Sequence, residues 1–181
     1  MKEQREVFAA GTEMTLERIR QMSYLERVLK EALRMYPPLV MLMRKVLRDF
    51  EFDGRVSPAG GVALVSPGAA HYIPEVFAAP ERFDPDRFGP GREEDKKFKN
   101  GFIPFGGGRH RCIGSTFALQ QVRVIWSILL RRFDVELVDR SPRPDYATFV
   151  VGPRRPCRMR YRVKRKAQVV APSAAVAAAP A

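Results

Sequence analysis

Several features that would assign this chain to a special class are scarce or absent. Among 181 residues there are only two cysteines, Cys112 and Cys157, and they form no Cys-x-x-Cys spacing. A disulfide framework is therefore excluded, a zinc site has no support, and a reducing cytoplasmic location is expected. No run approaches the roughly 18–20 apolar residues of a membrane span. The charged start from Lys2 to Glu6 is also unlike a secretory signal.

Acidic residues are few, at 20 against 32 lysines and arginines, which gives a net charge of +12. Eight of the basic residues fall between Pro153 and Lys166, where there is no acid. A nucleic-acid-binding module is therefore one alternative. However, Tyr161 is the only aromatic residue there that could stack on a base. We expect a solvated basic tail, no nucleic-acid partner, and disorder in the alanine-rich residues 167–181.

Apolar periodicity predicts two long helices. Ser23 and Glu26 have the spacing of a capping box, and the helix that follows should end at Pro37-Pro38. A short helix is expected after Thr15 and a second long one over 114–133. Strands are predicted at 41–47, 50–52, 62–65, 134–138 and 147–151, with Asp53-Gly54 as a hairpin turn. The expected fold class is mainly α with small antiparallel β-sheets, in one domain over residues 1–166.

Residues 66–105 combine prolines with aromatic rings. Six prolines are interspersed with five phenylalanines before Phe105 (Pro67, Pro74, Pro80, Pro85, Pro90, Pro104; Phe77, Phe83, Phe88, Phe98, Phe102). A flexible linker normally lacks so many buried-type rings. We therefore expect an ordered, packed meander.

The chemistry centres on Cys112, in the decapeptide Phe-Gly-Gly-Gly-Arg-His-Arg-Cys-Ile-Gly at 105–114. Three successive glycines remove the side chains that would keep a bulky flat partner away. Amides at the following helix start, with Arg109 and Arg111, would stabilise a thiolate, the form that binds metal. The residues alone leave two alternatives open, an inert buried thiol or a glycine loop that binds phosphate.

The decapeptide resembles the heme-binding signature of the cytochromes P-450. Two further family signatures occur in the family's order: Glu31-Ala32-Leu33-Arg34 matches its Glu-x-x-Arg helix, and Pro80-Glu81-Arg82-Phe83 matches its meander. His110, in Arg-His-Arg-Cys-Ile-Gly, looks like the sterol 14-alpha-demethylases, especially their bacterial members. The resemblance implies the C-terminal heme-binding part of that fold, incomplete, with heme b as cofactor.

The resemblance also implies roles for individual residues. Cys112 would be the axial iron ligand, and cofactor contacts would come from Arg44, Phe105, Gly106, Gly108, His110 and Gly114. Arg44 and His110 would bind the heme propionates, although His110 could instead be a loop histidine bonded to backbone. Val40, Met41 and Phe149 would lie near the substrate. Cys157 matches no family role.

A buried Glu31–Arg34–Arg82 network is implied as well, fixing the meander and the cysteine loop against the helix. Periodicity alone predicts the opposite, an exposed Glu31–Arg34 pair at spacing i,i+3.

The implied activity is monooxygenation, an O2-dependent oxidation of a hydrophobic, sterol-like substrate. Electrons would come from an acidic ferredoxin or flavoprotein reductase, steered by a basic surface (Lys96, Lys97, Lys99, Arg109, Arg111), unless these are simply solvated loop residues. The family's long distal helix, which precedes the Glu-x-x-Arg helix, has no match before Ser23. We therefore expect the isolated chain to be inactive. A heme-binding module without turnover and an inactive gene fragment remain alternatives.

Overall fold

The computed structural model describes residues 2–8, 12–139 and 142–164. The α-helices are α1 Lys2–Val7, α2 Leu16–Arg20, α3 Ser23–Met35, α4 Pro67–Ala70 and α5 Ser115–Arg132, and the short 3-10 helices are η1 Pro85–Phe88, η2 Glu94–Lys96 and η3 Gly108–His110. The strands are β1 Leu42–Lys45, β2 Phe50–Phe52, β3 Arg55–Ser57, β4 Val62–Val65, β5 Phe133–Leu137, β6 Pro144–Asp145, β7 Gly152–Pro153 and β8 Met159–Val163. The expected class, mainly α with small antiparallel sheets, is confirmed.

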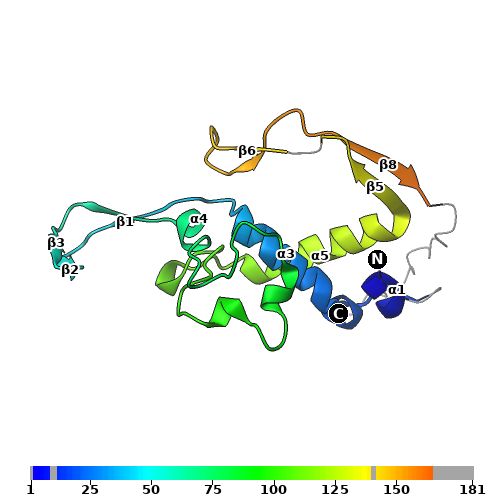
Figure 1. Cartoon of the computed structure of the whole chain (residues 1–181), viewed down its shortest axis with the longest axis horizontal. Helices are drawn as coiled ribbons and strands as arrows, with labels where there is room; N and C mark the ends of the chain where they lie inside the picture. The colour runs from blue at the N-terminus through cyan, green and yellow to red at the C-terminus, as the bar shows by residue number, and fades with distance from the viewer. Residues whose placement is uncertain (1, 9–11, 140–141, 165–181) are drawn as a thin grey trace, which may run out of the picture.

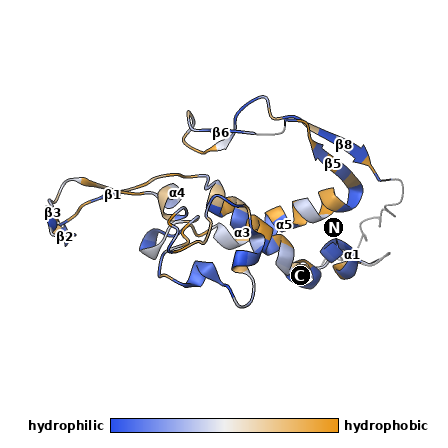
Figure 2. Ribbon diagram, viewed as in Figure 1, coloured by the Kyte–Doolittle hydropathy of each residue, from blue (hydrophilic) through white to orange (hydrophobic). Residues whose placement is uncertain are grey.

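The two long helices, α3 and α5, lie together at the centre of the molecule (Figure 1). Their contact contains the main core cluster, in which buried side chains from the first 29 residues meet α5 (Phe8, Ile19, Met22, Leu25, Leu29; Val122, Val124, Trp126). Hydrophobic residues line these helices, whereas the outer turns of the meander and β8 are mostly hydrophilic (Figure 2). Among the described residues, no helix combines the length and apolarity needed to cross a membrane.

The start of α3 differs from the prediction. Ser23 is the first helical residue, and Met22 before it makes no side-chain capping bond. The backbone amides of Tyr24 and Leu25 instead donate to the carboxylate of Glu3, at 2.5 and 2.9 Å. The capping box is therefore wrong, because a carboxylate from α1 satisfies the first-turn donors that a helix start leaves unpaired.

Glu26, the other half of the expected capping box, turns to α5. Its carboxylate lies 2.5 Å from the guanidinium of Arg123, which is buried. The Glu26 carboxylate thus pairs with Arg123 on α5 instead of with the backbone at the start of its own helix. The predicted end of α3 is confirmed, since its last residue is Met35, just before Pro37-Pro38.

The strands between 42 and 65 form a long hairpin that extends away from the helices (Figure 1). Strand β1 pairs antiparallel with β4, and β2 pairs with β3 at the tip. At the turn Asp53 and Gly54 have φ of 52° and 69°. Two successive residues at positive φ are typical of the tight turn that the Asp-Gly dipeptide predicts.

Part of the basic run, Met159–Val163, forms strand β8, whose residues are all exposed. Strand β8 pairs antiparallel with β5. Acidic groups on or beside β5 form ion pairs with cations on or beside β8: Arg160–Glu136 at 3.5 Å, Arg158–Asp139 at 3.4 Å and Lys164–Asp134 at 3.3 Å. The alanine-rich tail at 167–181 lies outside the described residues.

The strand predicted at 147–151 is wrong. Residues 147–150 form a bend between β6 and β7, which pair with each other. The amide of Val151 donates to the carbonyl of Pro38 at 2.8 Å, so the bend is attached to the segment after α3. The helix and strand predicted at 114–133 and 134–138 are confirmed to within a residue or two as α5 and β5.

The proline-rich meander is ordered, as predicted. Its own core consists of Val76, Phe77 and Phe88, with Phe102 packed against them. The rings of Phe88 and Phe102 lie 5.2 Å apart, and Phe77 meets Phe102 edge-on at 6.4 Å. This small aromatic cluster places the meander against α3.

Candidate functional site

A buried ion pair on α3 anchors the meander. Glu31 and Arg34 are both fully buried, and the guanidinium donates twice to the carboxylate, at 2.7 and 3.0 Å. Arg34 also donates to the backbone carbonyls of His71 at 2.9 Å and Pro80 at 2.7 Å. The exposed pair suggested by periodicity is therefore wrong, because the meander covers this side of the helix.

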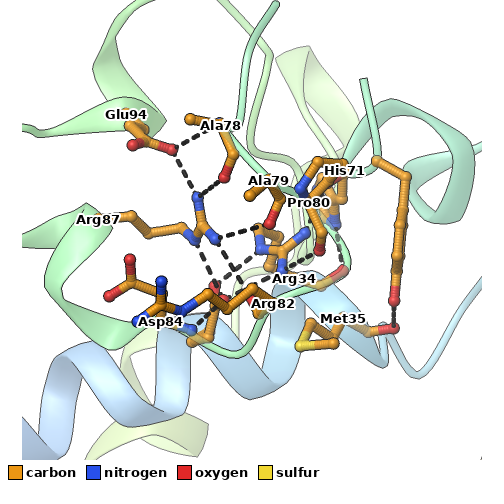
Figure 3. Close-up of polar contacts among 12 residues, drawn as sticks. Arg34, Met35, His71, Ala78, Ala79, Pro80, Arg82, Asp84, Arg87 and Glu94 are labelled. Carbon is orange, nitrogen blue, oxygen red and sulfur yellow. Dashed lines mark hydrogen bonds and ion pairs between the residues drawn. The ribbon is translucent and has the colours of Figure 1, made fainter. Parts of the chain in front are cut away.

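The third member of the network is Arg87, where the resemblance implied Arg82. Arg87 is fully buried and donates to Glu31 at 3.1 Å (Figure 3). The side chain of Arg82 is exposed, and only its backbone carbonyl takes part, accepting from Arg87 at 3.1 Å. The sequence Pro85-Asp86-Arg87-Phe88 repeats the Pro-x-Arg-Phe pattern five residues on, and this second copy reaches the ion pair.

Arg87 extends the network to a second acid that the sequence analysis missed. Glu94 accepts from Arg87 at 2.7 Å, from Arg92 at 2.7 Å and from the amide of Ala78 at 3.1 Å. Burial acts to raise the pKa of Glu94, but the hydrogen bonds from Arg92 and Arg87 outweigh it and lower that pKa. The only sequence signal for a role of Glu94 in an ion-pair network is its place in the charged run at 92–97.

His71 connects the ion pair to the chain that leads into the cysteine loop. Its ring is fully buried, with Nδ1 3.2 Å from the carbonyl of Arg34. The backbone amide of Ile103 donates to Nε2 at 2.9 Å. Burial lowers the pKa of His71 to about 4, so the ring is neutral at neutral pH.

The loop that carries Cys112 is closed by a backbone bond and open on its outer side. The amide of Cys112 donates to the carbonyl of Phe105 at 2.9 Å. Gly106 and Gly108 have φ of +73° and +65°, which L side chains rarely adopt, and a Cβ on Gly108 would meet nothing within 4 Å. A Cβ on Gly114 would lie 3.8 Å from the Cys112 sulfur. These glycines allow the tight turns of the loop and leave no side chains on its outer surface at their positions.

The exposed thiol has apolar neighbours that are themselves uncovered. Cys112 is a free, exposed cysteine. Ile113 beside it is fully exposed and Phe117, one turn into α5, is 72% exposed. A soft sulfur ligand flanked by open apolar surface suits a large, flat, apolar group that carries a metal ion. The residues present therefore fit a heme.

The predicted propionate-binding residues occupy different settings. On β1, Leu42 lies 3.6 Å from the position of a Cβ on Gly106, and Arg44 shares its face because side chains alternate along a strand. Arg44 is half-buried, with Nη1 2.8 Å from the carbonyl of Met43. His110 is exposed on η3.

The residues predicted near substrate are less closely grouped. Val40 lines a cavity of about 300 Å³ together with Tyr36, Tyr72 and Val151. Met41 and Phe149 are 53% and 77% exposed. The structure therefore places one of the three in a hollow and the others on open surface.

The basic residues expected to face a redox partner are exposed (Lys96, Lys97, Lys99, Arg109, Arg111). Lys96 forms an ion pair with Glu93 on the same turn.

The described residues thus bring together a helix-borne Glu–Arg pair, a meander held against that helix and an exposed cysteine on a glycine loop. Comparisons with known proteins identify the family. A family model for cytochrome P450 matches residues 1–158, and the chain belongs to this family.

Relatives include a sterol 14-demethylase from Arabidopsis thaliana, 42% identical over 90% of this chain and 35% of that protein. A sterol 14alpha-demethylase from Mycolicibacterium vanbaalenii is 40% identical over 87% of this chain and 35% of that protein. The solved structure of retinoic acid bound cyanobacterial CYP120A1 matches with a TM-score of 0.82 at 28% identity, over 90% of this chain and 37% of that one. The chain thus spans about a third of the length of the proteins it matches.

Proposed function

We propose that the protein acts in a heme-thiolate monooxygenase of the sterol 14-demethylase branch, oxidising a hydrophobic, sterol-like substrate with O2. The observation that carries this proposal is the exposed Cys112 sulfur on a loop whose glycines leave its outer side bare. Relatives at about 40% identity that are named sterol 14-demethylases support the branch.

Heme b, when bound, supplies oxygen activation, and an axial thiolate favours O–O cleavage. Cys112 is the proposed ligand, and Ile113 and Phe117 offer apolar surface beside it. Arg44 and His110 are the proposed cations for the propionates, since charge-assisted hydrogen bonds to carboxylates are strong. The network around Glu31 is proposed to hold the loop in place, through the bonds from Arg34 to the carbonyl of His71 and from the amide of Ile103 to the His71 ring.

The substrate and the electron donor follow from the same assignment. Val40, Met41 and Phe149 are the proposed substrate contacts. The exposed cations near the loop would steer an acidic ferredoxin or flavoprotein reductase to the side of the molecule that carries Cys112.

The isolated chain is predicted to hold heme weakly and to be inactive. Among the described residues the surface beside the cysteine is open (Ile113 and Phe117), and a heme covered on one face forgoes much of the stabilisation from burying both.

The test is spectroscopic. In the heme-loaded enzyme that contains this chain, reduction and carbon monoxide should give the red-shifted Soret band diagnostic of thiolate ligation. Cys112→Ser should abolish that band, whereas Cys157→Ser, the matched control, should keep it. Loss of the band in the Cys157 variant alone would contradict the assignment. A loaded protein with the band but no sterol oxidation would favour a heme-binding module without turnover.

A further inference from the structure

His71 makes hydrogen bonds to two segments that are distant in sequence. It follows α4, and its ring lies between the end of α3 and the chain just before the cysteine loop. The backbone carbonyl of His71 accepts a hydrogen bond from the Arg34 side chain, so the backbone and the ring of His71 both bond to one residue of α3. Figure 3 shows His71 beside Arg34 and Pro80.

The bond pattern allows only one form of the ring. The amide of Ile103 can only donate, so Nε2 must accept and carry no proton. Nδ1 must then hold the proton, which it donates to the carbonyl of Arg34. A doubly protonated ring would place two N–H groups against each other at Ile103. The low pKa that burial imposes agrees with this neutral form.

Two backbone hydrogen bonds connect Ile103 to the cysteine loop. The carbonyl of Ile103 accepts from the amide of Gly106 at 3.0 Å, which forms the turn that begins the loop. Phe105, within that turn, accepts from the amide of Cys112 at 2.9 Å. The position of Ile103 therefore influences where the Phe105 carbonyl lies, and that carbonyl accepts the hydrogen bond from the backbone amide of Cys112.

We propose that His71 is a positioning residue whose neutral ring fixes the start of the cysteine loop to Arg34 and thereby holds Cys112 in place as a metal ligand. The role of Cys112 as a metal ligand rests on the proposed function, whereas the tether between His71 and the start of the loop does not. Two aromatic neighbours limit the ring's freedom, with Phe102 at 5.3 Å and Phe77 at 6.3 Å between centroids. The ring is thus held in the plane that both bonds need.

The matched variants are His71→Phe, His71→Gln and Tyr72→Phe. His71→Phe keeps a ring of similar size and removes both ring bonds, and His71→Gln restores one donor and one acceptor. Tyr72→Phe is the control, because it removes a hydroxyl bond to the carbonyl of Met35 on α3, at 3.2 Å, without touching the loop.

Hydrogen exchange of a peptide covering 103–106 in the heme-loaded enzyme tests the tether itself. We expect exchange about tenfold faster in His71→Phe, with a return toward wild type in His71→Gln and no change in Tyr72→Phe. The fraction of loaded heme that gives the thiolate Soret band tests the consequence. It should fall in His71→Phe and recover in His71→Gln at equal heme content, which a general loss of stability would not produce.

The outcomes separate the two proposals. Faster exchange in a protein whose wild type never shows the thiolate band would uphold the tether and defeat the proposed function. Unchanged exchange and an unchanged thiolate fraction in His71→Phe would overturn this inference. If that variant does not fold, nitrogen NMR of the wild-type reduced, carbon-monoxide-bound enzyme decides, with the His71 ring assigned through its contact with the backbone amide of Ile103. His71 must show a protonated Nδ1 and an unprotonated Nε2, and the other tautomer would overturn the tether.

Discussion

Replacing Arg87 by alanine should destabilise the heme-loaded protein strongly, whereas the same change at Arg82 should have little effect. Arg87 is fully buried and bridges the carboxylates of Glu31 and Glu94. Arg82 has an exposed side chain only five residues away, so the two variants remove the same chemical group from different places.

The magnitude follows from what each deletion leaves behind. Loss of Arg87 removes hydrogen bonds to both carboxylates and to three backbone carbonyls, those of Ala78, Ala79 and Arg82. Removing one partner of a buried charge pair costs about 3–5 kcal/mol. Glu31 keeps Arg34 and Glu94 keeps Arg92, so the lower end, about 3 kcal/mol, is expected. Loss of the exposed Arg82 side chain should change the free energy of unfolding by less than about 0.5 kcal/mol.

Thermal unfolding followed by circular dichroism, with heme content measured in parallel, checks this. The shift in Tm per kcal/mol falls as a protein grows, so the two variants are compared within the same protein, and Arg87→Ala should lower Tm by several times as much as Arg82→Ala. Arg87→Lys keeps the charge but not the planar guanidinium, and its Tm should lie between those of the wild type and Arg87→Ala. An Arg82→Ala variant as unstable as Arg87→Ala would refute the assignment of the third network member to Arg87.

Three further predictions concern other parts of the chain. Glu3→Gln should destabilise the protein by about 0.5–2 kcal/mol in urea titrations, because the Glu3 carboxylate caps α3; Glu6→Gln, which changes an exposed residue of α1, is the control, and equal effects would contradict the capping role. The pKa of Glu94 in the folded state lies below the ordinary value of a glutamate, because the hydrogen bonds from Arg92 and Arg87 outweigh burial, so its contribution to stability is fully present above the unfolded-state pKa and is lost as pH falls through the lower folded-state pKa. Unfolding measured from pH 3 to 7 should therefore show a shallower acid loss in Glu94→Gln, and parallel curves would refute this. Reversing the charge at Lys97 and Lys99 should slow reduction by an acidic donor at low salt and matter less at high salt in stopped-flow experiments; unchanged rates at low salt would leave these lysines as solvated loop residues.

The long helices could be predicted because their determinants are local. The apolar spacing of α3 and the two prolines that end it are visible in the sequence, and the glycine before α5 marks its start. The Asp-Gly turn is equally local, since both residues adopt the positive φ that the dipeptide favours. Such elements need no knowledge of what packs against them.

The errors arose where distant groups compete with local ones. Ser23 and Glu26 have the spacing of a capping box, but Glu3 supplies the carboxylate and Arg123 attracts Glu26. The apolar stretch at 147–151 resembles a strand, yet its residues bend so that Val151 can bond to Pro38. No pattern within either segment reveals the partner.

The burial of Glu31 and Arg34 shows a limit of helical periodicity. A helical wheel identifies the apolar side of α3 that meets α5, and it assigns every charged position to solvent. The opposite side is covered by the meander, where Arg34 satisfies two backbone carbonyls and Glu31 accepts the amide of Asp84 at 2.8 Å. Charged groups can be buried there because each has its partners, which composition does not show.

The choice between Arg82 and Arg87 depends on where a turn begins. Both lie in a Pro-x-Arg-Phe sequence, but Asp84 caps the second, accepting from the amide of Asp86 at 3.1 Å while its own amide bonds to Glu31. The turn that follows buries Phe88, whereas Phe83 of the first copy is 50% exposed. An Asp-Pro start is itself a turn signal that the first copy lacks, since alanine precedes Pro80. The residue that reaches the ion pair is thus decided by the cap in front of the motif and not by the motif itself.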